Sequence, residues 1–76
     1  MNKMRRKALN EIMEQLEELK SQLEDIQSEE EEYRDNMPEN LQGSERYERA
    51  DEAVSNIEDA VSNLEDAISS IDSAME

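Results

Sequence analysis

Two rows of apolar residues, spaced alternately three and four positions apart, constrain the fold of this 76-residue chain more than any other feature. The first row consists of Leu9, Ile12, Leu16, Leu19, Leu23, Ile26 and, after the polar Glu30, Tyr33. The second row consists of Tyr47, Ala50, Val54, Ile57, Val61, Leu64, Ile68, Ile71 and Met75. This is the heptad spacing of helices that pack almost parallel to one another, so both halves of the chain are predicted to be helical.

The segment between the two rows, residues 35–43, contains the only Pro and the only Gly of the chain. Pro38 disfavours helical backbone in the residues before it, so the first helix is predicted to cover about 3–34. Ser44 is a favourable N-cap for a second helix over about 44–75, because its hydroxyl can accept a hydrogen bond from the first turn. The sequence therefore predicts two long helices joined by one loop.

The register of the two helices also follows from the spacing. If the chain folds so that paired residue numbers add up to 80, every apolar residue of the first row faces an apolar residue of the second, and Leu19 pairs with Val61, while Glu30 faces Ala50. A shift by one residue removes all of these pairs. We therefore predict an all-α fold, a single antiparallel two-helix hairpin covering residues 1–76. An Asp at Leu19 or Val61 is predicted to unfold it, since either would place an unpaired charge in a central layer.

A column of alanines widens the apolar stripe of the second helix. Its members, one in each heptad, are Ala53, Ala60, Ala67 and Ala74. The small side chains can simply let the two helices approach each other closely, or they can form a second face on which another copy of the chain docks. Because two helices alone make a thin core, we favour the second interpretation and expect a homodimer in the form of a four-helix bundle.

The residue types present exclude most kinds of catalytic and metal site. There is no Cys and no His, which removes disulfides, thiolate nucleophiles, His general bases and the usual zinc ligands. The densest acidic run, 29–32, points its carboxylates around the helix axis, whereas calcium needs oxygens that converge on one point. A two-helix hairpin also offers no pocket that could tune a carboxylate pair for acid–base chemistry. We therefore predict that the protein is not an enzyme and holds no metal or cofactor.

Net charge limits the partners. The chain carries 22 acidic and 8 basic residues, a formal charge of −14 at pH 7. Such a charge repels nucleic acid and anionic membranes and attracts basic protein surfaces. No apolar run approaches the roughly 20 residues of a membrane-spanning helix. The expected partner is therefore a protein with a basic surface, such as a nucleic-acid-binding enzyme, and neither nucleic acid itself nor a membrane.

Half of the basic residues lie at the N-terminus, as Lys3, Arg5, Arg6 and Lys7. In the hairpin this cluster comes beside the acidic C-terminal end around Asp72 and Glu76, so intramolecular neutralisation is the simple interpretation. An arm that binds nucleic acid is the alternative. Four charges without an aromatic platform, on a strongly acidic body, favour the first interpretation.

The acidic surface itself is the candidate binding site. A helix of about 31 residues spans about 46 Å, and duplex DNA of that length carries roughly 27 phosphates, comparable with 22 carboxylates. The acidic residues predicted to lie opposite the seam are Glu58, Asp59, Glu65 and Asp66 in the second helix and Glu17, Glu18, Glu24 and Asp25 in the first. No basic residue follows Arg49, so no residue of the second helix neutralises this ladder.

The loop is the alternative binding site. Met37 and Leu41 are apolar residues at the tip of the hairpin, and they can either cover the end of the core or insert into a partner. We favour the first role, because the end of the core otherwise exposes Tyr33 and Tyr47.

The segment 31–47, EEYRDNMPENLQGSERY, resembles a stretch found in small acidic proteins of prophages and mobile elements of Firmicutes. In those proteins too, a charged heptad helix precedes the stretch and an Ala-rich acidic helix follows it. The resemblance implies a bacterial host cytoplasm and a phage-type role, in which small acidic proteins inhibit host defence or host nucleic-acid enzymes, as anti-CRISPR and anti-restriction DNA mimics do.

We therefore expect a non-enzymatic inhibitor that occupies a basic, nucleic-acid-binding surface of a host protein. Two other functions stay open. The chain can be a structural or assembly protein that acts through helical oligomerisation, or a regulatory partner that offers its Ala-rich helix to the groove of another protein.

Overall fold

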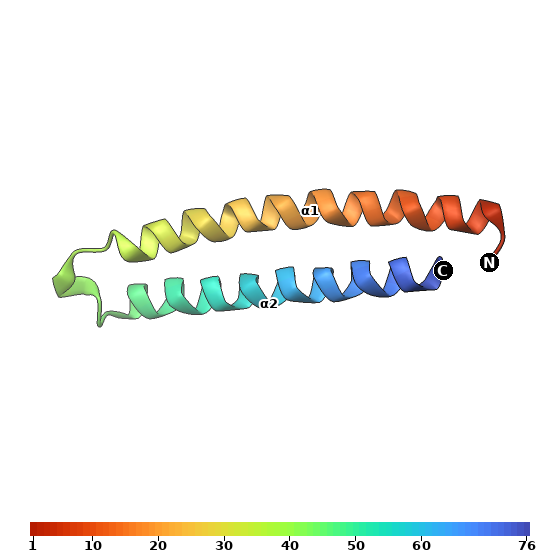
Figure 1. Ribbon diagram of the computed structural model, residues 1–76. Coiled ribbons are helices and arrows are strands. Elements are labelled where there is room, and N and C mark those ends of the chain that lie inside the picture. Colours follow the sequence, from red (N-terminus) through yellow and green to blue (C-terminus); the bar gives the residue numbers. More distant parts are fainter.

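Two long helices lie side by side and antiparallel in the computed structural model, which describes all residues 1–76 (Figure 1). Helix α1 covers Lys3–Asp35, helix α2 covers Glu45–Ala74, and a single turn of 3-10 helix, Glu39–Leu41, lies in the connection. The molecule is a rod with Cα extents of 59 × 15 × 12 Å, and both termini lie at the same end of it. The predicted all-α hairpin is confirmed.

Local interactions explain where the helices begin and end. The Asn2 side chain accepts a hydrogen bond from the backbone N–H of Arg5 at 2.8 Å and caps α1. The Ser44 hydroxyl accepts one from the backbone N–H of Tyr47 at 3.3 Å, which confirms the predicted N-cap of α2. Helix α1 continues to Asp35, one residue beyond the expected end, and α2 is one residue shorter at each end.

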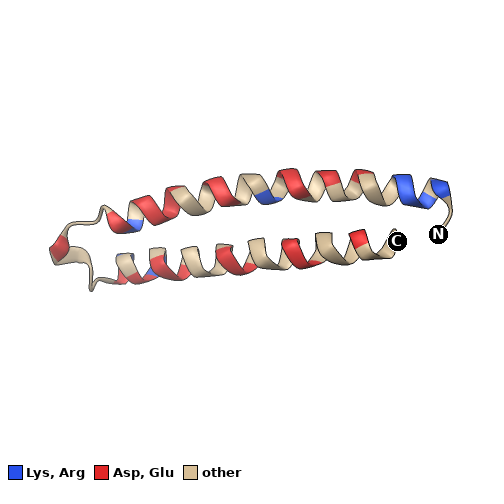
Figure 2. Ribbon diagram, viewed as in Figure 1, with Lys and Arg blue, Asp and Glu red and all other residues tan.

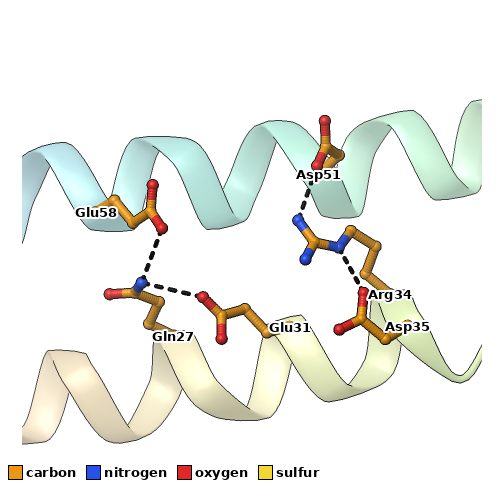
Figure 3. A network of polar contacts seen from close by, with 6 residues as sticks. All are labelled: Gln27, Glu31, Arg34, Asp35, Asp51 and Glu58. Atoms are coloured by element: carbon orange, nitrogen blue, oxygen red, sulfur yellow. Dashed lines mark hydrogen bonds and ion pairs between the residues drawn. The ribbon is translucent and has the colours of Figure 1, made fainter.

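Three polar contacts between α1 and α2, along one edge of the rod, show the register of the two helices. They are Lys20–Glu65 at 3.8 Å, Gln27–Glu58 at 3.3 Å and Arg34–Asp51 at 2.8 Å, two of which appear in Figure 3. The two residue numbers in each contact add up to 85. If the seam pairs add up to 80, two residues whose numbers add up to 85 are offset along the rod. Side chains lean toward the N-terminus of their own helix, and in an antiparallel pair this leaning brings the two offset side chains together. The contacts therefore agree with the predicted register. We call the edge that these six residues form the polar edge.

The core is thin and belongs mainly to α2. Only four residues of the chain are buried, namely Met37, Ala50, Val54 and Val61. Helix α1 contributes no buried residue, although Leu9, Leu16 and Leu23 are half-buried against α2. The hairpin therefore has a continuous apolar seam but no enclosed interior.

The predicted seam is wrong for one row of α1. The large apolar side chains of this row are 47–50% exposed, and they are Ile12, Leu19, Ile26 and Tyr33. The residues that follow them in the sequence are half-buried instead, and they are Met13, Lys20, Gln27 and Arg34. Helix α1 is thus rotated about its axis toward the polar edge. This rotation brings two cations and an amide of α1 to carboxylates of α2.

At the loop end, Met37 is only 7% exposed and Leu41 is half-buried. The backbone N–H of Met37 donates to the carbonyl of Arg34 at 3.3 Å, which folds the loop back over the end of the rod. An open hollow of about 470 Å³ lies beside this segment, between the loop and Tyr33. The burial of Met37 favours its role as a cover of the core over insertion into a partner.

Candidate protein-interaction surfaces

All eight acidic residues predicted to form the binding surface are exposed. Their positions differ from the prediction in one respect. Glu58 and Glu65 lie on the polar edge next to the seam, where Gln27 donates to Glu58 and Lys20 lies 3.8 Å from Glu65. The sequence argument considered only the basic residues of α2, and the structure adds a partner for Glu65 from α1.

The other six acidic residues of the predicted surface have no ion-pair partner. They are Asp59 and Asp66 on α2 and Glu17, Glu18, Glu24 and Asp25 on α1. Figure 2 shows acidic residues along most of the length of both helices. Four of the 22 acidic residues take part in ion pairs, which leaves 18 without one. The hairpin therefore presents unpaired carboxylates along most of the rod.

The strongest ion-pair cluster lies near the loop, where Arg34 bridges two carboxylates (Figure 3). Its Nε donates to Asp35 at 3.0 Å and its Nη1 donates to Asp51 of α2 at 2.8 Å. The hydrogen bond to Asp35, followed by that to Asp51, raises the pKa of the Arg34 guanidinium above its ordinary value. This side chain links the last turn of α1 to the start of α2.

The basic N-terminal cluster lies at the C-terminal end of α2, as predicted (Figure 2). Its one recorded contact, however, involves a backbone carbonyl, because Arg6 Nε donates to the carbonyl oxygen of Met75 at 3.1 Å. Neither Asp72 nor Glu76 forms an ion pair. The cluster thus complements the negative end of the α2 dipole as well as the acidic chain end.

The edge opposite the polar edge carries no charge over its central part, which the sequence reasoning missed, whereas Glu30, Arg46 and Arg49 lie along it near the loop. On α1, Leu19 and Lys20 lie about 60° before and 40° after Leu16 around the helix axis. On α2, Ala60 and Glu65 lie about 100° before and 40° after Val61. Lys20 contacts Glu65 on the polar edge. Leu19 and Ala60 lie on the other side of the seam in their helices, so they must share the opposite edge.

We call this second edge the uncharged face. On α1 it comprises Ile12, Gln15, Leu19, Gln22 and Ile26, and on α2 it comprises Ala53, Asn56, Ala60, Asn63 and Ala67. The three alanines are half-buried, whereas Ala74, which was predicted to belong to the same column, is exposed at the end of α2. Uncharged residues at these heptad positions in both helices, in a chain that is 39% charged, were the signal that could have revealed the face.

Neither helix combines the length and the apolar character that crossing a membrane requires. No three acidic side chains are grouped so that they could hold a metal ion. Comparison of the chain with protein-family models, with curated proteins and with solved structures finds no match.

Proposed function

We propose that this chain is a non-enzymatic, phage-type interaction protein that occupies a basic, nucleic-acid-binding surface of a host protein. The observation that carries the proposal is the set of 18 carboxylates without ion-pair partners, spread over a rod of 59 Å. Duplex DNA of that length carries about 35 phosphates. One hairpin offers about half that charge, and two hairpins side by side offer about as much as DNA.

The proposal has a clear physical signature. Attraction between exposed charges is screened by salt, so the target should bind with a rapid, salt-sensitive association. Duplex DNA should compete for the same target surface, because both ligands present rows of anionic oxygens at comparable density.

The test begins with capture of host proteins that bind nucleic acid, followed by competition on the purified target. The protein should displace duplex DNA, and its affinity should fall as salt is raised. Replacing Glu18 and Asp25 with Gln and Asn, together with Asp59→Asn and Asp66→Asn, should weaken binding at least tenfold. A control exchanges Asp and Glu at the same four positions, keeps the charge, and should bind like the wild type. Unchanged binding by the neutralised variant would refute the proposal.

A second candidate function is that of a structural or assembly protein that acts through helical oligomerisation. The half-exposed apolar row of α1, which lies on the uncharged face, favours it. In either case we propose a homodimer with the architecture of a four-helix bundle. Salt separates the two functions, because a partner held by apolar contacts should not dissociate as ionic strength rises.

A further inference from the structure

We propose that a second copy of the chain docks on the uncharged face in one defined orientation. The two-fold axis runs parallel to the rod, both loops lie at the same end, and α1 of each copy packs on α2 of the other. This inference rests on the homodimer proposed above and specifies its interface.

Exposure of the α1 row is the first observation. Single exposed apolar residues are ordinary on soluble proteins, but this row repeats every seven residues. The part that lies on the uncharged face, from Ile12 to Ile26, runs for about 21 Å along one side of the helix. A periodic row of half-exposed, large apolar side chains on one side of a helix favours a site of protein contact.

The total surface area is the second observation. The hairpin exposes 5761 Å², whereas a compact monomer of 8.8 kDa is expected to expose about 4,800 Å². The excess of about 1,000 Å² is close to the roughly 800 Å² that each partner buries in a standard protein–protein interface. One copy docked along the rod would therefore remove the excess.

Charge is the third observation, and it selects the occupant. Two molecules that each carry −14 repel each other, so their association is favoured through a surface poor in carboxylates. The uncharged face supplies such a surface over the central part of both helices, with Gln and Asn side chains around the apolar ones. Docking through it leaves the unpaired carboxylates of both copies on the outside, available to a basic target.

The orientation follows from the sizes of the side chains and from their positions along the rod. In the register of the hairpin, Leu19 lies at the level of residue 61, and Ile12 and Ile26 lie at the levels of residues 68 and 54. A two-fold axis along the rod keeps these levels, so Leu19 of one copy meets Ala60 of the second copy. Large side chains then pack on small ones, as interdigitating layers require. Every helix also has antiparallel neighbours, as in an up-down-up-down bundle.

The opposite orientation, with loops at opposite ends, fits less well. It would pack the large apolar row of α1 on the same row of the second copy, and the alanine column of α2 on the same column. The distance between the two α1 helices would then have to be larger than that between the two α2 helices. The two orientations predict different neighbours for Ile12. In the proposed one its neighbour is Ala67 of the second copy, and in the opposite one its neighbours include Ile26 of the second copy.

Disulfide trapping tests the orientation without interference, because the chain has no Cys of its own. Ile12→Cys, labelled with ¹⁵N, is mixed with either Ala67→Cys or Ile26→Cys, and mixed disulfides are identified by mass after mild oxidation. The first mixture should crosslink, and the second should not, since positions 12 and 26 are then about 21 Å apart in level. Crosslinking in the second mixture alone would overturn the orientation.

Sedimentation equilibrium tests the interface. Gln22→Glu with Asn63→Asp adds carboxylates to the uncharged face with little change in shape, and should weaken the dimer at least tenfold at low salt. Ser28→Asp with Ser62→Asp adds the same charge elsewhere on the helices and should weaken it far less. Circular dichroism should show unchanged helicity in both variants, and if the first loses helicity, Leu19→Gln replaces it in the comparison.

A wild type that stays monomeric at about 50 µM, where a dimer near −6 to −7 kcal/mol would form, overturns the inference. A monomer that still displaces DNA from the target would leave the proposed function standing. A dimer that crosslinks as expected but binds no basic target would retain the inference and remove the function.

Discussion

Replacing Val61 with Asp should unfold the hairpin, whereas replacing Leu19 with Asp should leave the isolated hairpin folded. The sequence predicts that the two residues form one layer of the seam, but in the structure their exposures differ widely. The Val61 side chain is 8% exposed and Leu19 is 50% exposed. An Asp at position 61 would be placed between the helices, while an Asp at position 19 can keep its carboxylate in water.

The magnitudes separate the two variants clearly. Loss of the buried Val61 side chain costs about 2 kcal/mol, and burial of an unpaired carboxylate raises the total to about 4 kcal/mol or more. Leu19 loses about half of its burial, about 1 kcal/mol, and Asp adds about 0.5 kcal/mol through its lower helix propensity. A domain of 76 residues is stabilised by about 4–11 kcal/mol, and the thin core puts this protein near the lower value. Only Val61→Asp removes most of that stability.

The assay is thermal and urea unfolding followed by circular dichroism at about 1 µM, a concentration at which the proposed dimer is dissociated. Val61→Thr serves as the control, because it keeps the shape of the side chain and adds a hydroxyl without a charge. It should lose less stability than Val61→Asp. Equal destabilisation at positions 19 and 61 would show that α1 is not rotated as described, and a native midpoint in Val61→Asp would show that Val61 is not buried between the helices.

Three further predictions concern the cap, the ion pairs and the net charge. Ser44→Ala should lower the stability by about 1 kcal/mol, because the first turn of α2 loses its cap, and urea unfolding would measure the loss. Arg34→Gln should lower the stability only slightly, since an ion pair at the surface is screened by solvent. Because the carboxylates of Asp35 and Asp51 raise the pKa of Arg34, its contribution is complete below its ordinary pKa and is lost only in strong alkali, so the difference from wild type should be equal at pH 7 and pH 9. Raising NaCl from about 0.01 M to about 0.5 M should increase the melting temperature, because salt screens the repulsion within a chain of charge −14, and a decrease would mean that ion pairs outweigh repulsion.

The two edges of the hairpin have different chemical character, and this division underlies both proposals. The polar edge joins α1 to α2 through side chains that neutralise a few carboxylates. The uncharged face carries the apolar surface that the hairpin cannot bury by itself. The remaining surface carries the unpaired carboxylates. Self-association and binding to a basic target can therefore occur on the same molecule without competing for the same residues.

Spacing and local chemistry were sufficient to predict the two helices, their antiparallel course and the Ser44 cap. These features depend on residues close together in the chain or on a period that repeats many times, so they can be read without knowledge of the partner helix. The seam of α2 was also readable, because Val54 and Val61 are the centre of its apolar stripe.

The rotation of α1 could not be read in the same way. Around its axis, the rows that contain Leu19 and Lys20 lie within about 60° of the seam on either side, so the apolar pattern alone favours Leu19. The choice depends on what α2 offers across the interface, and it offers carboxylates such as Glu65 to the side on which Lys20 lies. A cation and a carboxylate from distant parts of the chain meet only when both helices are in place. In the arrangement that contains these pairs, the polar row lies inward and the apolar row is exposed.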